Sequence, residues 1–157
     1  MVSVERRAAI DDFLADYAHG LDDDDAEAWP DFFTAKGVYQ ILTKEEHDAG
    51  LPLGIFLVEG HGMMRDRVRA MRDANIFEPH HYCHVVGRAR LREADDGEIA
   101  ARSNFAVYRT MQDGTADLFA SGKYLDRIVF EGEAPKFKQR IAVLDSRCID
   151  VLLVMPL

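Results

Sequence analysis

Side chains of the types that bind metals are densest between residues 80 and 84 of this 157-residue chain. The segment reads His-His-Tyr-Cys-His, and in a β-strand His80 and His84 would lie on the same face. A metal site needs three or four converging ligands with hydrogen-bonded support, and the sequence shows no further ligands grouped with these two. Histidines that form hydrogen bonds at the start of a strand are the simpler interpretation, so we expect no metal here.

The two cysteines do not form the pattern of an iron–sulfur site. A Rieske cluster is held by two cysteines and two histidines in clustered pairs. Cys83-His84 has no matching pair, because Cys148 is followed by Ile-Asp-Val. The sequence also has neither a Gly-x-Ser-x-Gly motif nor a glycine-rich phosphate-binding loop. We therefore expect neither nucleophilic catalysis nor a bound cofactor in this chain.

Acid–base chemistry inside a curved sheet is the remaining enzymatic possibility. The side chains that could line such a site are Tyr17, Tyr39, His84, Asp126 and Asp145. A buried Asp–His or Tyr–Asp pair can be tuned for proton transfer. The two carboxylates could instead pair with arginines such as Arg127, Arg140 and Arg147 at the edge of the sheet, and we favour this structural interpretation over a catalytic one.

The elements that would position these groups begin with a central strand from Ile99 to Arg109. Alternation along it places four residues on one face: Ala101, Ser103, Phe105 and Val107. Turn signals follow at Asp113-Gly114 and near Gly132–Pro135. They separate two further runs with β patterning, Asp117–Phe130 and residues 137–143. Three strands joined by short turns predict an antiparallel meander. The residues expected to form its dry core are Phe105, Val107, Leu125, Val129, Ile141 and Val143.

Hydrophobic spacing predicts helices ahead of this meander. The apolar side of the first helix would consist of Ile10, Phe13, Leu14, Tyr17 and Leu21. The next expectations are a helix with Trp29, Phe32 and Phe33 that ends at Gly37, a strand at Val38–Leu42, a loop at Thr43–Glu59, a helix at Gly60–Ile76 and a strand at His84–Glu93. Helices first and strands later predict a single α+β domain spanning residues 1–157, with the helices covering one face of a strongly curved sheet.

Composition excludes several function classes. The formal net charge of −9 argues against a nucleic-acid-binding protein, which normally has a basic face. The first residues do not form the apolar run of a signal peptide, and the apolar segment 151–157 is far shorter than the ~20 residues of a membrane span. Two isolated cysteines are typical of a reducing compartment, so we expect a cytoplasmic protein.

Two features are typical of a subunit interface. Arginines alternate along residues 88–92, where they would form either a solvated face or pairs with carboxylates of a neighbouring subunit. The last residues are more apolar than one terminal strand of a monomer needs. The predicted interface comprises Arg88, Arg90, Arg92, Val151, Leu152, Leu153, Met155 and Leu157.

Several segments occur in an order and spacing that resemble a known family. They are Arg102–Arg109, Asp117–Asp126 and Arg140–Asp145, together with Trp29–Phe33 and His80–His84. From about Tyr17 to Leu157 the chain resembles the small (β) subunits of bacterial aromatic-ring-hydroxylating dioxygenases. Within that family it looks most similar to the terephthalate dioxygenase subgroup, through segments such as Ala120–Asp126 and residues 155–157.

The resemblance implies a cone-shaped fold similar to nuclear transport factor 2 (the NTF2-like, or cystatin-like, fold). In the family the large α subunit carries the Rieske 2Fe–2S cluster and the mononuclear Fe(II), and the subunits assemble as an α3β3 hexamer. The implied function is a non-catalytic subunit of an oxygenase that dihydroxylates an aromatic carboxylate, with electrons from NAD(P)H delivered by a reductase. The alternative is a stand-alone acid–base enzyme of the same fold, such as a polyketide cyclase, dehydratase or isomerase.

Overall fold

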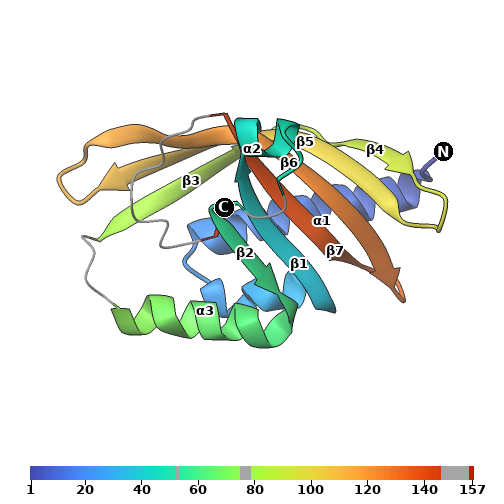
Figure 1. Cartoon of the computed structure of the whole chain (residues 1–157), viewed down its shortest axis with the longest axis horizontal. Helices are drawn as coiled ribbons and strands as arrows, with labels where there is room; N and C mark the ends of the chain where they lie inside the picture. Colours follow the sequence, from blue (N-terminus) through green and yellow to red (C-terminus); the bar gives the residue numbers. More distant parts are fainter. Residues whose placement is uncertain (52–53, 75–78, 146–155) are drawn as a thin grey trace.

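The computed structural model describes residues 1–51, 54–74, 79–145 and 156–157, which form a curved seven-stranded sheet with its longer helices on one side (Figure 1). The strands are β1 (Phe33–Thr43), β2 (Phe56–Glu59), β3 (His80–Val86), β4 (Arg90–Glu93), β5 (Ile99–Met111), β6 (Ala116–Glu131) and β7 (Ala134–Leu144). The helices are α1 (Val4–Asp22), the 3₁₀-helix η1 (Ala26–Phe32), α2 (Lys44–Asp48) and α3 (Gly60–Ala74). This arrangement confirms the expected α+β class.

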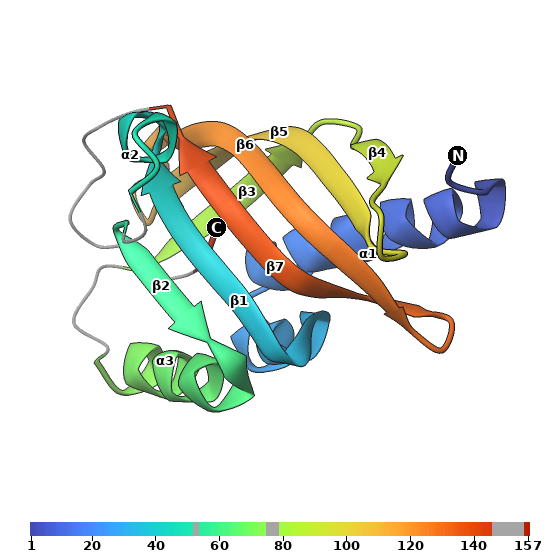
Figure 2. The same ribbon diagram turned by 45° about the vertical axis from the view of Figure 1, so that its right-hand side comes forward.

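The strand order is β2-β1-β7-β6-β5-β3, and β4 pairs with β5 as well. β1 runs parallel to β7, and every other pair is antiparallel, so β5, β6 and β7 are the predicted meander. Figure 2 shows α1 crossing one face of these strands. We call this the inner face of the sheet and the opposite one the outer face. No helix within the described residues is long and apolar enough to cross a membrane.

The inner face of β5 is formed by the residues that the alternation placed there. The buried residues are Ala101, Ser103, Phe105 and Val107. The Phe105 ring stacks on the Tyr124 ring of β6 with centroids 4.2 Å apart. From α1, the rings of Phe13 and Tyr17 contact Phe137 of β7, at 4.6 and 5.4 Å. The apolar side of α1 is thus buried against the sheet, as its spacing predicts.

Three of the six residues predicted for the dry core are not fully buried. Phe105, Val107 and Val143 are buried, but Leu125, Val129 and Ile141 are only half-buried. The inward positions near them on β6 and β7 are held by charged residues, Asp126 and Arg140, which pair with each other. Apolar alternation therefore predicted the wrong phase for this part of the sheet.

The segment between α1 and α3 differs from the expectation in two places. The second helix ends at Phe32, and β1 begins at Phe33 rather than after Gly37. The expected loop 43–59 contains α2 and β2. Thr43 begins α2 with a capping box, because its hydroxyl accepts a hydrogen bond from Glu46 N–H while the Glu46 carboxylate accepts one from Thr43 N–H. This Thr-x-x-Glu signal was present in the sequence and was overlooked.

The single strand expected over His84–Glu93 is two strands, β3 and β4. Both pair with β5, and the chain is interrupted between them at residues 87–89. Gly87 N–H donates a hydrogen bond to Asn104 O, and Arg88 is exposed in the interruption. Arg88 therefore does not share a strand with Arg90 and Arg92 as the alternation predicts.

Candidate functional site

The inner face of the sheet holds a buried ion pair. Asp126 of β6 and Arg140 of β7 are cross-strand partners, 3% and 1% exposed, with Arg140 Nε 3.1 Å from Asp126 Oδ1. The guanidinium lies against three aromatic rings, at 3.6 Å from the centroid of Tyr124, 4.3 Å from Tyr17 and 4.5 Å from Phe137. The expectation that Asp126 pairs with an arginine is confirmed, but the pair lies buried between two inner strands and not at the edge of the sheet.

Burial rather than a catalytic partner sets the proton affinities in this cluster. Loss of solvation raises the pKa of Asp126 to about 6, although the adjacent Arg140 favours its ionised form. Burial also raises the pKa of Tyr17 to about 12. A tyrosine with that pKa stays protonated at neutral pH, and Asp126 has Arg140 as its partner. The arrangement is that of a structural cluster.

Leu157 occupies the space between this cluster and β1. The hydroxyls of Tyr17 and Tyr39 both donate to Leu157 O, each over 2.9 Å, and Leu157 N–H donates to Tyr39 Oη over 2.7 Å. Trp29 Nε1–H in turn donates to Tyr17 Oη over 3.1 Å. Leu157 is 1% exposed within this chain. Its assignment to a subunit interface is therefore wrong: the apolar side chain is already covered by the chain's own core.

The other predicted interface residues of the C-terminal segment are Val151, Leu152, Leu153 and Met155. They lie outside the described residues, as does Arg147. Asp145 accepts a hydrogen bond from Ser121 Oγ over 3.3 Å. Of the five acid–base candidates, the structure brings Tyr17, Tyr39 and Asp126 into one buried cluster, and it places Asp145 at the end of β7.

His84 has a partner that sequence reasoning missed. Asp22, at the end of α1, accepts hydrogen bonds from the backbone N–H of His84 and lies 2.6 Å from its Nδ1. The His84 side chain is 1% exposed, and its Nε2 has no hydrogen-bond partner among the described residues. The two residues are 62 positions apart, so no local pattern could have joined them. Within the described residues there is no group of three or more His, Cys, Asp or Glu that could hold a metal ion.

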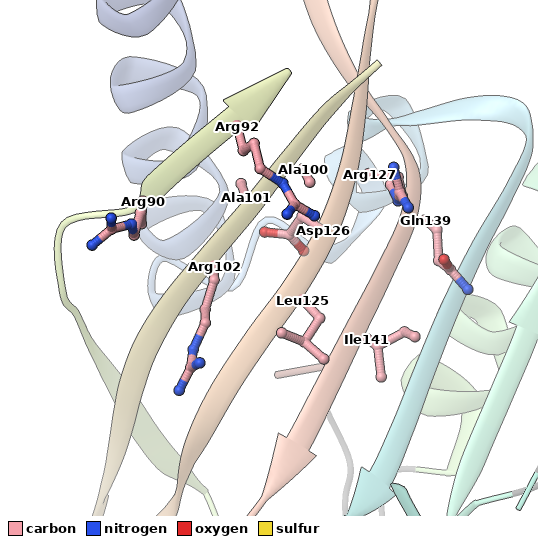
Figure 3. Close-up of a pocket in the computed structure, with 10 residues that line it drawn as sticks. All are labelled: Arg90, Arg92, Ala100, Ala101, Arg102, Leu125, Asp126, Arg127, Gln139 and Ile141. Atoms are coloured by element: carbon pink, nitrogen blue, oxygen red, sulfur yellow. The ribbon is translucent and has the colours of Figure 1, made fainter. Parts of the chain in front are cut away.

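The outer face of the sheet carries a groove of about 530 Å³ (Figure 3). Four arginines from β4, β5 and β6 line it, and Leu125 and Ile141 form an apolar floor at its β6–β7 side. The arginines are Arg90, Arg92, Arg102 and Arg127. Two of the three arginines expected at an interface thus line the groove, and Arg88 does not. Arg102 lies on this face because it alternates with the buried residues of β5, and the strand order shows which residues are its neighbours.

The register arranges the groove in two rows that cross the strands. One row runs Arg90, Arg102, Leu125 and Ile141; the other runs Arg92, Ala100, Arg127 and Gln139. Arg90 is therefore directly opposite Arg102. Among the described residues, Arg127 reaches Glu98 at 4.0 Å, whereas no ion pair is recorded for Arg90, Arg92 or Arg102. Arg90, Arg92, Arg102 and Arg127 thus form a basic strip on a chain whose formal net charge is −9.

Comparison with known proteins identifies relatives over nearly the whole chain. The family described as "Ring hydroxylating beta subunit" matches residues 17–151. The chain is 39% identical to the terephthalate 1,2-dioxygenase terminal oxygenase component subunit beta 2 of Comamonas sp., over 92% of this chain and 94% of the relative. It is 36% identical to the anthranilate 1,2-dioxygenase small subunit of Burkholderia cepacia, over 90% of this chain and 88% of the relative.

Solved structures agree with these matches. A crystal structure of a beta subunit assigned to an aromatic-ring-hydroxylating dioxygenase of Novosphingobium aromaticivorans superimposes with a TM-score of 0.87 at 36% identity, covering 96% of both chains. A protein of the same organism assigned as a scytalone dehydratase superimposes with a TM-score of 0.67 at 16% identity, over 88% of this chain and 83% of that one. The second match shows the shared NTF2-like fold alone.

Proposed function

The chain belongs to the family of ring-hydroxylating β subunits, and from this membership we propose that it is the non-catalytic small subunit of a multicomponent aromatic-ring dioxygenase. Its role would be to support the subunit that carries the iron. The pairing of the acid–base candidates and the family membership both support a subunit that supplies no reactive group.

The observation that carries the proposal is that the acid–base candidates on the inner face of the sheet are engaged with other groups of this chain. In a stand-alone enzyme of this fold we would expect an open pocket with a free acid–base pair. Here Asp126 is held by Arg140, and Tyr17 and Tyr39 are held by the backbone of Leu157. Buried polar groups that pair with one another satisfy each other's hydrogen-bonding capacity, which is a structural role.

An aromatic carboxylate is the proposed substrate class of the complete oxygenase. Terephthalate and anthranilate, which appear in the names of the two relatives, are both benzene rings bearing carboxylate. The proposed partners are a large subunit with a Rieske 2Fe–2S cluster and a mononuclear Fe(II), and further copies of this chain in an α3β3 hexamer. A reductase would supply electrons from NAD(P)H, and the complex would be cytoplasmic.

We also propose that residues 1–157 form one domain and that two parts of this domain contact other subunits. Arg88, Arg90 and Arg92 remain candidates because all three are exposed. The segment 151–155 remains a candidate because of its apolar sequence. Leu157 is no longer included.

One observation favours the alternative of an acid–base enzyme. His84 and Asp22 form a buried pair whose free Nε2 could accept a proton, as in a catalytic dyad. The pair also has a structural explanation, because Asp22 receives the backbone N–H of His84 and so joins the end of α1 to β3. We therefore rank this alternative second.

Co-purification tests the proposal. The chain is produced alone and together with the large subunit encoded beside it, whose sequence should contain Cys-x-His and Cys-x-x-His Rieske motifs. We expect iron and oxygenase turnover only in the co-purified complex. Stoichiometric iron in the isolated chain, or failure of the two chains to associate, would refute the proposed function.

A further inference from the structure

On the outer face two arginines lie opposite each other on neighbouring strands, and no ion pair to either is recorded within the described residues. Arg90 and Arg102 are direct cross-strand partners, and like charges in such positions destabilise a sheet. The acidic turn between β4 and β5 lies at the opposite end, where Asp95 and Asp96 share a hollow with Arg92 and Arg127. The Arg90–Arg102 end is therefore the more strongly basic part of the groove.

Basic character continues beyond this end of the groove. Arg102 also borders a second hollow of about 370 Å³, which includes Lys44 and Lys123 and one carboxylate, that of Asp145. Lys44 is paired with Asp48, whereas no ion pair is recorded for Lys123 within the described residues. A basic strip thus crosses the outer face from β4 to β6, beside the apolar side chains of Leu125 and Ile141.

We infer that this strip, centred on Arg90 and Arg102, binds a carboxylate-bearing segment of the large oxygenase subunit. The inference rests on the proposed function and specifies which surface makes the contact. Arginine forks match carboxylates in a bidentate geometry, and arginines beside an apolar patch are typical of an interface. Carboxylates placed between Arg90 and Arg102 would also remove the repulsion between them.

A second copy of this chain is the less suitable occupant. A two-fold contact uses the same surface on both copies, so it would set arginine rows against arginine rows. Such a contact would repeat the repulsion instead of relieving it. In the threefold arrangement of the proposed hexamer, the strip would instead need an acidic patch elsewhere on the neighbouring copy. An acidic partner agrees better with the charge of the strip.

The experiment compares single charge reversals in the complete chain. Arg90→Glu changes the strip, and Arg65→Glu on the exposed side of α3 is the control with the same change of net charge. Binding of the large subunit to each amino-terminally labelled chain is titrated at low and at high sodium chloride concentration. Thermal unfolding and sedimentation of the chain alone are measured in parallel.

We expect Arg90→Glu to weaken binding of the large subunit about tenfold or more and to reduce its dependence on salt. The same substitution should leave the melting temperature of the isolated chain unchanged or raise it, because the new carboxylate at position 90 lies opposite the positively charged Arg102. Arg65→Glu should bind like the wild type. A folding defect cannot produce this combination of a weaker complex and an equally stable chain.

Wild-type-like binding by Arg90→Glu would overturn the inference while leaving the proposed function intact. Loss of self-association by Arg90→Glu with unchanged binding of the large subunit would also overturn it and assign the strip to a second copy. If the wild-type chain does not bind the large subunit at all, the proposed function itself fails.

Discussion

Arg140 and Asp126 face each other across β6 and β7 and meet at 3.1 Å in the buried interior. A buried ion pair is weak support for stability as a whole, because removing two charges from water costs about what their attraction returns. Losing one partner is different, since the other charge then remains buried without compensation.

Substitution of one member of this pair should be severe. We expect Asp126→Ala to lower the free energy of unfolding by about 3–5 kcal/mol, because Arg140 keeps its charge at all accessible pH values. Urea unfolding followed by circular dichroism measures this. The double variant Asp126→Leu with Arg140→Met should lose less than the sum of the single changes. Strict additivity would show that the two groups do not depend on each other.

The ion pair between Arg72 of α3 and Glu27 of η1 should weaken in acid. Hydrogen bonds from Arg72 lower the pKa of Glu27 to about 2. The folded-state pKa lies below the unfolded value of 4.5, so this contribution is complete above that value and is lost as pH falls toward 2. Glu27 is 62% exposed, so solvent screening limits the contribution to about 1 kcal/mol or less.

Arg72→Gln should remove this acid sensitivity. Urea midpoints of the wild type and the variant should differ at pH 6 and converge as the pH falls through about 4 to 2. Arg65→Gln is the matched control, because Arg65 is exposed on the same helix. A difference that stays constant over the whole range would exclude the Glu27 carboxylate as its source.

Gly122 should tolerate no side chain. A Cβ at this position would lie 1.9 Å from Val143 O, a backbone atom that cannot rotate away. We expect Gly122→Ala to cost about 1–3 kcal/mol, as overpacking does. Gly62→Ala in α3 has no atom within 4 Å of the new Cβ and should instead stabilise by about 0.5–1 kcal/mol. Thermal unfolding of both variants decides, and a stable Gly122→Ala would contradict the packing described.

The contact between Tyr39 and Leu157 should contribute to stability through its hydroxyl. Tyr39→Phe leaves the buried N–H of Leu157 without this partner, at a cost of about 1–3 kcal/mol. Tyr108→Phe, at an exposed tyrosine, should change the unfolding free energy by less than about 0.5 kcal/mol. Equal stability of the two variants would mean that Leu157 is not held in this way.

The sequence predicted the elements with regular alternation and missed those that depend on pairing. Ala101–Val107 alternates small or apolar residues with polar ones, so both the position and the phase of β5 were correct. The phase near Leu125 and Ile141 was wrong because the inner face there holds Asp126 and Arg140, charges that are buried only because they pair.

The candidate sites could be predicted only in part, for a similar reason. Alternation located Arg90, Arg92 and Arg102, but the interruption at residues 87–89 sets the register that places Arg90 opposite Arg102. His84 was a candidate, whereas Asp22 comes from a distant helix. Contacts between elements far apart in the chain follow from the three-dimensional arrangement and leave no local sequence pattern.

The most direct test of the central claim is the turnover of the assembled oxygenase when the pair that most resembles a catalytic dyad is removed. Asp22→Asn and His84→Gln are introduced into this chain, each complex is isolated at full size, and product formation from an aromatic carboxylate is measured per iron of the large subunit. We predict turnover within about twofold of the wild type for both variants, since a non-catalytic subunit contributes no proton transfer. A loss of a hundredfold or more in an intact, iron-loaded complex would show that this chain takes part in the chemistry and would contradict the account.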